Sequence, residues 1–289
     1  MRRKGRGKKM KSNPYKIEGP ALISFSGGRT SGHMLYHILE AHDFNLPEDV
    51  HITFANTGKE MEQTLDFVQE CSKRWGVKIH WLELEIFDEK PVYRTKEVTY
   101  ETASRNGEPF EALVDRKKFL PNPVARFCTA ELKIRRMRDF MRKVMGYDHW
   151  DNVIGLRYDE PRRVMSARKS ADRERWESIM PLYDAEVTKE DVAEFWRNQE
   201  FDLQLENYNG VAPEGNCDLC FLKASQTRKN MIKKYPGMAD WWIKQEQKFG
   251  DHKGATFRKD GPTYIDLVDI SNSEVELFDD GLGDCTCHD

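Results

Sequence analysis

Two consecutive glycines directly after an apolar segment are the feature that most constrains the fold of this chain. Residues 21–25 are mostly apolar, and the six residues that follow are Ser26, Gly27, Gly28, Arg29, Thr30 and Ser31. Glycine lets a backbone turn sharply and approach a ligand closely, because it has no Cβ. The first N–H groups of a following helix carry partial positive charge that suits phosphate or sulfate. The pattern predicts an anion-binding turn with added hydroxyl and guanidinium donors; an ordinary strand–helix turn is the alternative.

The first half of the chain alternates between strand and helix patterns. Strands are expected at residues 22–25, 50–55 and 78–84, and helices at 32–40 and 62–75. This alternation predicts an α/β fold with a parallel twisted sheet and helices on both faces. Such sheets bind ligands at the carboxyl ends of their strands. Asn56, Thr57 and Gly58 follow the second strand, so we expect them to line the same crevice as the glycine turn.

The rest of the chain predicts fewer regular elements. Residues 88–125 are rich in charge, proline and glycine and are interpreted as a long loop or insertion. Helices are expected at 131–144, 190–197 and 223–249, the last broken at Pro236-Gly237, and a short buried strand at 152–156. We expect a basic flexible tail at 1–13, one domain at 14–271 whose C-terminal part carries cysteines, and an acidic mobile tail at 272–289.

Composition limits the classes of function. No run of 18 apolar residues is present, so no membrane span is expected. The first 11 residues hold seven lysines and arginines but no apolar core of a signal peptide, which predicts a cytoplasmic protein. This basic segment is either a solvated tail or a weak nucleic-acid contact. The remaining chain has 39 basic and 49 acidic residues, which argues against a broad DNA-binding face.

Cysteines form the second group of candidate functional residues. Cys217 and Cys220 make a CxxC, and Cys128 lies 89 residues before it. Three thiolates can hold three corners of a 4Fe–4S cluster. They can equally hold zinc with a fourth ligand from Cys285, Cys287 or a histidine; unligated cysteines are the plain alternative. Cys285 and Cys287 lie close to His288 in the sequence, which favours a thiolate, so one of them is a candidate nucleophile.

Basic residues at a strand end form the third candidate group. Arg157 directly follows the expected strand at 152–156, and therefore falls at a carboxyl edge of the sheet. A guanidinium offers a fork of donors that suits phosphate or sulfate. Lys133 follows Cys128 and adds positive potential beside the cysteines. A solvated charged loop is the alternative. The Walker pattern G-x-x-x-x-G-K-[ST] is absent, which argues against a P-loop NTPase.

Taken together, these motifs resemble the phosphoadenosine phosphosulfate reductase family within the PP-loop ATP pyrophosphatase superfamily. Residues 26–31 resemble the PP-loop, residues 56–64 its D-T-G…E-T segment, and residues 155–159 its G-x-R-x-D/E segment. Pro181-Leu182 with residues 190–192 resembles its P-L…D-V segment. The resemblance runs in order from about residue 20 to 225 and implies an adenine nucleotide alpha hydrolase-like fold that binds an adenine nucleotide. Thr30 stands where ATP-cleaving members usually carry an acid.

The cysteines extend this resemblance to the iron–sulfur branch, the adenylyl-sulfate reductases. Cys128 matches the first cysteine of a Cys-Cys pair, with Thr129 in place of the second, and Cys217 and Cys220 match a distant CxxC. The resemblance implies a 4Fe–4S cluster on these three residues. Residues 284–288 resemble the mobile E-C-G-L-H nucleophile of the reductases, which implies a role for Cys285 or Cys287.

The resemblance implies two enzymatic readings. In the first, a sulfonucleotide lies over the PP-loop with Arg157 and Lys133 near its sulfate, and Cys285 or Cys287 attacks sulfur before a thioredoxin-like donor completes the reduction. In the second, ATP activates a nucleic-acid base or another acceptor for attack by sulfur. A zinc-stapled nucleotide-binding module without turnover is the non-enzymatic alternative.

Overall fold

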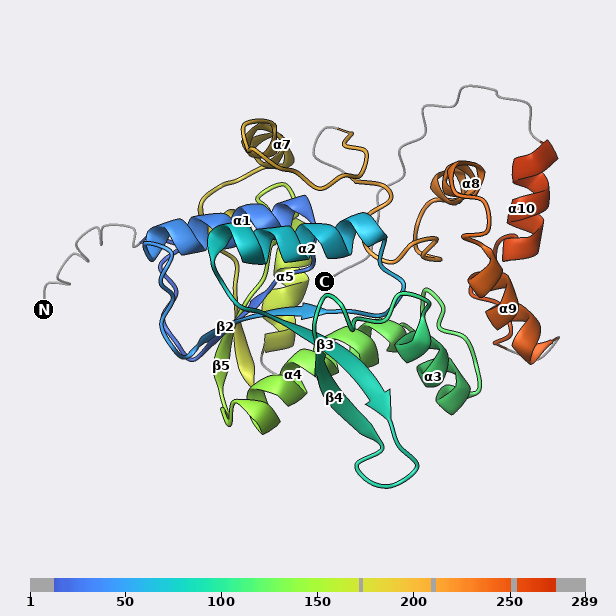
Figure 1. Cartoon of the computed structure of the whole chain (residues 1–289), viewed down its shortest axis with the longest axis horizontal. Coiled ribbons are helices and arrows are strands. Elements are labelled where there is room, and N and C mark those ends of the chain that lie inside the picture. Colours follow the sequence, from blue (N-terminus) through green and yellow to red (C-terminus); the bar gives the residue numbers. More distant parts are fainter. Residues whose placement is uncertain (1–12, 172–173, 209–211, 251–253, 274–289) are drawn as a thin grey trace, which may run out of the picture.

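One six-stranded sheet forms the centre of the molecule, in the order β4-β3-β2-β1-β5-β6 (Figure 1). The computed structural model describes residues 13–171, 174–208, 212–250 and 254–273. The strands are β1 (Ala21–Ser24), β2 (Val50–Ala55), β3 (Ile79–Ile86), β4 (Tyr93–Val98), β5 (Trp150–Val153) and β6 (Trp176–Ile179). All neighbouring pairs are parallel except β3 with β4. The predicted α/β fold with a parallel sheet is confirmed.

Helices cover both faces of the sheet, because side chains alternate in direction along each strand. Ile23 of β1 joins the main apolar cluster with Met34 of α1 (Arg29–Ala41) and Leu65 of α2 (Glu62–Trp75). Leu22 joins a second cluster with Phe140. Phe140 begins η2 (Phe140–Val144), which continues the helical run of η1 (Thr129–Ile134) and α4 (Arg135–Asp139). Figure 1 shows α1 and α2 on one side of the strands and α4 on the other.

Further helices follow β5 along the chain. They are α5 (Pro161–Ala171), α6 (Pro181–Asp184) and α7 (Lys189–Arg197). A capping box between Thr188 and Asp191 starts α7. Trp196 of α7 donates its Nε1–H to the carbonyl oxygen of Arg29 at 2.7 Å. The buried indole therefore anchors α7 on the first turn of α1, the turn that follows the glycine loop.

Residues 88–125 are not the long loop that their composition suggests. They contain β4, which pairs antiparallel with β3, and α3 (Glu108–Lys117). The strand is hard to recognise because most of β4 is half-buried or exposed at the edge of the sheet, so its sequence is polar. The sequence patterns also missed α5, β6, α6 and α10 (Tyr264–Ser273).

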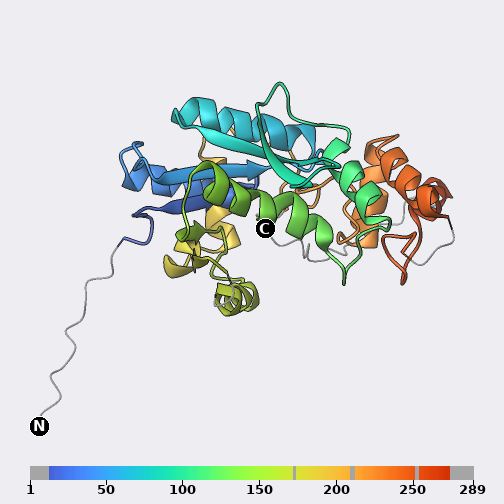
Figure 2. The ribbon, with the colours of Figure 1, turned by 90° about the horizontal axis from the view of Figure 1, so that it is seen from below.

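The C-terminal helices form a group beside the end of the sheet (Figure 2). They are α8 (Ser225–Lys234), α9 (Asp240–Phe249) and α10, and the predicted break at Pro236-Gly237 separates α8 from α9. Trp242 and Tyr264 stack with ring centroids 5.2 Å apart, and Phe257 packs on both. Glu246 accepts the backbone N–H groups of Phe257 and Tyr264. This aromatic core holds the helices together.

The order of the strands determines where a ligand can bind. The chain runs from β1 outward to β2 and β3, then returns to β5 and β6 on the other side of β1. The loops after β1 and β5 therefore leave in opposite directions, and open a crevice at the carboxyl edge. None of the described helices is long and apolar enough to cross a membrane. The predicted tails at 1–13 and 272–289 lie almost entirely outside the described residues.

We expect buried His33 to make stability fall in acid. Burial is the main cause that lowers its pKa from 6.5 to about 3, and its ring packs 4.8 Å from Phe195. The unfolded chain therefore binds the proton first, so the stabilising contribution is complete above about pH 6.5 and is lost progressively toward about pH 3. The free energy of unfolding should fall by about 2 kcal/mol from this group between about pH 8 and 5.

Urea unfolding of His33→Phe at several pH values measures this contribution. The variant should show a smaller loss of stability in acid than the wild type, because its side chain does not titrate. His149→Phe, at an exposed residue, is the matched control and should keep the wild-type pH dependence. A pH dependence of His33→Phe equal to that of the wild type would contradict the assignment.

Candidate functional site

The turn after β1 depends on Gly27. Its φ is +77°, a conformation that side chains rarely adopt. A Cβ at this position would lie 2.7 Å from Cγ2 of Thr64 and 3.0 Å from Cγ2 of Val68, both in α2. Gly28 is different, because its φ of −101° is ordinary and a Cβ there would meet only Ser26 Oγ at 3.7 Å. Gly27 is thus required by the fold, whereas Gly28 leaves open space above the start of α1.

Hydroxyl groups hold the glycine loop in one shape. The Oγ atoms of Ser26 and Ser31 lie 2.9 Å apart, and Ser31 Oγ also donates to the carbonyl oxygen of Gly28 at 3.0 Å. The backbone N–H of Ser26 donates to Ser31 Oγ. The loop is therefore preorganised at the N-terminus of α1, where free N–H groups and the helix dipole favour an anion. The predicted strand, turn and helix are present.

Arg29 differs from its predicted role as an anion donor. Its side chain is buried, and Nε donates to both carboxylate oxygens of Asp202, at 2.8 and 3.0 Å. Nη2 donates to Asp202 and to the carbonyl oxygens of Leu203 and Leu205. The guanidinium therefore ties the glycine loop to the segment after α7. Sequence patterns could not reveal this, because Asp202 lies 173 residues away.

Arg157 reaches the glycine loop from the end of β5. Its Nη1 donates to Thr30 Oγ1 at 3.1 Å, while Nε and Nη2 pair with the carboxylate of Asp159. Gly155 makes this approach possible, since a Cβ there would lie 3.3 Å from Cα of Ser31. The structure thus brings together Thr30 and Arg157, two predicted site residues from opposite sides of the crevice.

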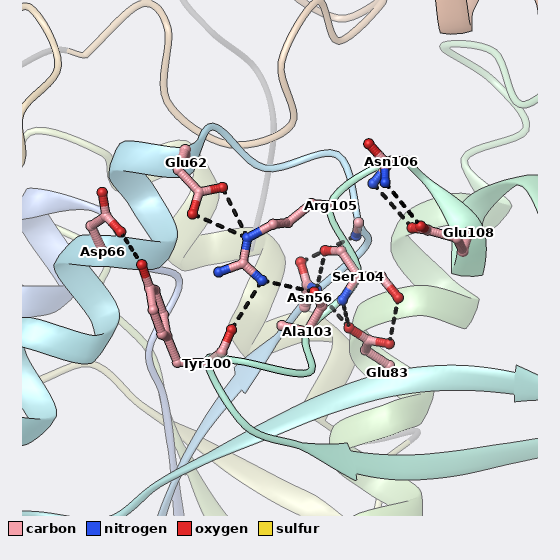
Figure 3. A network of polar contacts seen from close by, with 11 residues as sticks. Asn56, Glu62, Asp66, Glu83, Tyr100, Ala103, Ser104, Arg105, Asn106 and Glu108 are labelled. Carbon is pink, nitrogen blue, oxygen red and sulfur yellow. Dashed lines mark hydrogen bonds and ion pairs between the residues drawn. The ribbon is translucent and has the colours of Figure 1, made fainter.

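The loop after β2 is tied to the neighbouring strand β3 by the buried carboxylate of Glu83 (Figure 3). Asn56 donates its Nδ2–H to Glu83 of β3 at 2.7 Å and to the carbonyl oxygen of Ser104 at 2.8 Å. Ser104 donates to the same carboxylate through its N–H and its Oγ–H. The Oδ1 of Asn56 accepts the N–H of Gly58 at 3.1 Å. Asn56 therefore positions the loop, because both the nitrogen and the oxygen of its side-chain amide form hydrogen bonds.

A second set of contacts in Figure 3 joins the segment after β4 to the start of α2. Arg105 pairs with Glu62 at the start of α2, and its Nη1 donates to the carbonyl oxygens of Tyr100 and Ala103. Glu83, Ser104 and Arg105 were not predicted as site residues. Glu83 could have been noticed as a carboxylate between two leucines of a predicted strand, whereas the other two carry no sequence signal.

The CxxC lies against the loop after β2. Glu60 and Cys217 form a β-bridge, and Thr57 Oγ1 lies 3.5 Å from Cys217 Sγ. Lys59 Nζ pairs with the carboxylate of Asp218 at 2.8 Å, with both side chains nearly buried. Asp218 also accepts the Nε1–H of Trp242 at 2.8 Å. Burial raises the pKa of Asp218, and the positive charge of Lys59 opposes this rise. The C-terminal helices are thereby joined to the candidate site.

The three cysteines predicted as metal ligands do not form one group. No three His, Cys, Asp or Glu side chains among the described residues are arranged to hold a metal ion. Cys217 bridges Glu60 in the loop after β2, and Cys128 directly precedes η1. Burial raises the pKa of the Cys128 thiol, and the charge of Lys133 only partly opposes this. The described part of the chain therefore does not fit a 4Fe–4S cluster or a zinc ion.

The predicted nucleophiles Cys285 and Cys287 lie outside the described residues. What the described part provides is a crevice at the carboxyl edge of the sheet, lined by hydrogen-bond donors. It has the glycine loop on one side, the Arg157 guanidinium above Thr30 on the other, and Thr57 with Cys217 at the neighbouring strand end. Such an arrangement can hold an anionic group at the N-terminus of a helix and stabilise negative charge that develops on it.

Comparison with known proteins gives a family match and two relatives. The family model of the phosphoadenosine phosphosulfate reductase domain matches residues 20–205. An uncharacterised nin region protein, ORF290 of Escherichia phage lambda, is 32% identical over 211 residues, which are 71% of this chain and 67% of that protein. An uncharacterised protein of Methanocaldococcus jannaschii is 37% identical over 81 residues, 28% of this chain and only 16% of that protein.

Two solved structures are similar at low identity. A phosphoadenylyl-sulfate reductase from Candida auris, in complex with phosphate, has a TM-score of 0.40 and 11% identity over 65% of this chain and 79% of that chain. The U34-tRNA thiolase NcsA from Methanococcus maripaludis, with its 4Fe–4S cluster, has a TM-score of 0.38 and 15% identity over 93% of this chain and 77% of that chain.

The two loop glycines should respond differently to substitution. Gly27→Ala should lower the free energy of unfolding by about 2 kcal/mol or more, because it combines a positive φ with a clash against α2. Gly28→Ala should change stability by less than about 0.5 kcal/mol, since nothing blocks its Cβ. Urea unfolding of both variants checks the difference, and equal losses would contradict the loop geometry.

Arg29 and Arg157 form a second matched pair. Arg29→Met should cost about 2–3 kcal/mol of stability, because it leaves Asp202 and two carbonyl groups without their donor. Arg157→Met should cost less than about 1 kcal/mol, since its carboxylate partners are partly solvated. Thermal and urea unfolding measure both. If the Arg29→Met variant kept its stability but lost anion binding, this would contradict the structural role of Arg29 and show that its guanidinium binds the ligand.

Proposed function

The chain belongs to the phosphoadenosine phosphosulfate reductase domain family, and we propose that it binds an adenine sulfonucleotide at the glycine loop and reduces its sulfate through a cysteine thiolate. The family model covers the glycine loop, the loop after β2 and Arg157. The phosphate and sulfate groups would lie at the N-terminus of α1. Ser26, Gly27, Gly28, Thr30 and Ser31 line that position.

The contact between Arg157 and Thr30 is the observation that carries this proposal. It places a guanidinium at the mouth of the glycine loop, at the residue where ATP-cleaving relatives usually carry an acid. A guanidinium there favours a bound anion directly, whereas an acid would serve a metal ion held by the nucleotide. The arrangement therefore suits a sulfated nucleotide better than a nucleotide bound through a metal.

The chemical step can be written with its electrons in balance. The thiolate of Cys285 or Cys287 attacks the sulfur of the sulfate group, forming a sulfur–sulfur bond. The bond between that sulfur and the bridging oxygen breaks, and its electron pair leaves with the phosphate of the nucleotide. A thioredoxin-like dithiol then attacks the cysteine sulfur and releases sulfite. Its second thiol resolves the mixed disulfide, so oxidation of the dithiol supplies the two electrons.

Residues of the described crevice would assist this step. Arg157 would neutralise charge on the sulfate, and the N–H groups of the glycine loop would stabilise the phosphate as it leaves. Lys133 follows Cys128 in η1 and would add positive potential. Among the described residues, the thiol of Cys217 lies close to the end of β2, with its Sγ 3.5 Å from Thr57 Oγ1.

ATP-dependent sulfur transfer to a nucleic-acid base is the second candidate. The observation that favours it is the concentration of lysine and arginine on the two helical segments around residues 129–144 and 161–171, beside the crevice. In this reaction the nucleotide would activate a carbonyl oxygen of the acceptor, and sulfur would displace the resulting adenylate. Release of pyrophosphate distinguishes it from reduction, which uses no ATP.

Anaerobic assays with adenylyl sulfate and phosphoadenylyl sulfate test the proposal. Sulfite should form in the presence of a dithiol reductant, and Arg157→Met should lower kcat/KM about 10- to 100-fold, the loss of one charged hydrogen bond. Arg197→Met, at an exposed residue of α7, should keep the wild-type rate. A chain ending at Asn272 should bind the nucleotide but release no sulfite.

Other outcomes would decide against reduction. Pyrophosphate from labelled ATP without sulfite would establish the second candidate. Nucleotide binding without either product would indicate a binding module without turnover. Calorimetry that detects no affinity for any adenine nucleotide, sulfated or not, would contradict the proposal as a whole.

A further inference from the structure

Positive charge is concentrated on one face of the sheet. Residues 129–144 and 161–171 hold ten lysines and arginines and two acidic residues, a formal charge of +8 in a chain whose net charge is −3. Arg142, Arg162 and Lys169 are exposed. None of these three forms an ion pair with another described residue, whereas Arg163 and Lys143 do. This face therefore carries positive side chains that are available to bind an anionic partner.

A cavity of about 280 Å³ lies between these two helical segments and the sheet. Its walls come from β1, β5 and β6 on one side and from η1, α4 and α5 on the other. Trp150 and Trp176 line it with ring centroids 5.4 Å apart, and Met137 adds an apolar side chain. The volume is close to the lower limit of small-molecule sites, about 300 Å³.

Three residues that line this cavity each have a buried hydrogen-bond donor without an acceptor among the described residues. Trp150 is 5% exposed, and its Nε1 has no hydrogen-bond partner among the described residues. The Nε atoms of Arg138 and Arg163 are also buried and equally without an acceptor in that part of the chain. All three residues line the cavity. Each unpaired buried donor costs about 1–3 kcal/mol. A ligand that enters the cavity and shifts these enclosed side chains until its acceptors reach the three donors would recover this energy.

From these observations we propose that the cavity binds one unpaired base of a single-stranded nucleic acid. A base has a flat apolar body that suits the two indole rings, and ring nitrogens and carbonyl oxygens that suit the three donors. The phosphates of the same strand would lie over Arg142, Arg162 and Lys169. A duplex keeps its bases stacked and would leave the cavity empty, so a single strand fits better.

The position of the cavity connects this site to the proposed function. Ser24 and Leu156 line the cavity, and they stand two residues before Ser26 and one residue before Arg157. A base held there would lie beside the nucleotide on the glycine loop. It would be the acceptor in the second candidate reaction, although binding of the strand can be measured whichever reaction occurs. The inference therefore rests on the second candidate function and deepens it, because it names the kind of strand and the cavity that would hold its base.

Fluorescence anisotropy on the full chain tests the proposal. The probes are labelled single strands of RNA and DNA of about 12 nucleotides, a duplex of the same sequence, and a strand with abasic sites. The single strands should bind at least about 10-fold more tightly than the duplex and the abasic strand. Arg162→Ala/Lys169→Ala should weaken binding about 10-fold and lower the salt slope by about 1.4, since each lost contact removes about 0.7.

Two further variants separate the charged rim from the cavity. Lys73→Ala/Arg197→Ala removes the same charge from α2 and α7, around α1, and should leave the affinity unchanged. Ser166→Trp, at an exposed residue that lines the cavity, should fill it and abolish the preference over the abasic strand. No measurable binding of a single strand at about 50 mM salt, or equal losses in both double variants, would overturn the proposal.

Competition distinguishes this proposal from the proposed function. If free adenine nucleotides displaced the strand from the cavity, the cavity would belong to the base of the small substrate, and the strand site would be overturned. Calorimetry with adenylyl sulfate on the same samples reports the glycine loop separately. Loss of that signal with intact strand binding would contradict sulfonucleotide binding while leaving the strand site in place.

Discussion

Close packing around two glycines is the constraint on which the rest of the site depends. Gly27 turns the chain with a positive φ under Thr64 and Val68, and Gly155 lets the loop after β5 reach Cα of Ser31. A side chain at Gly27 would clash with α2, and one at Gly155 would push the loop after β5 away from Ser31. The hydroxyl contacts and the Arg157–Thr30 hydrogen bond are short-range, so they form only because the glycines bring their partners together. The anion site is therefore a product of packing as much as of donor groups.

The second requirement is the attachment of the C-terminal helices to the loop after β2. Lys59 and Asp218 form an ion pair with little solvent access, and Trp242 adds a hydrogen bond to the same carboxylate. Such a pair adds little net stability because both charges lose hydration, but it is specific about geometry. It fixes Cys217 beside Thr57, at the neighbouring strand end. The family match ends at residue 205, so this part of the site belongs to a segment beyond it.

Much of the sheet could be predicted because its signals are local. The glycine turn, the buried strand β2 and the amphipathic helix α2 follow from residues close together in the sequence, and β2 and α2 have the predicted bounds. β4 could not be predicted, because an edge strand needs no apolar alternation. The role of Arg29 was also invisible, since its partner Asp202 comes from a distant segment that folding brings close. The same holds for Ser104, whose partner Glu83 is itself only a carboxylate in a strand until the chain folds around it.

Average properties of the chain hide how charge is distributed over the fold. The chain after residue 11 has 39 basic and 49 acidic residues, which argues against a broad DNA-binding face, yet the segments 129–144 and 161–171 together carry +8. The rest of the chain is correspondingly acidic, and its acids pair with local cations, as Asp202 does with Arg29. Screening limits the reach of exposed charges to about 8–10 Å at moderate salt. A polyanion near α4 and α5 therefore responds to the local excess of positive charge, because the acidic residues of more distant surfaces are screened from it.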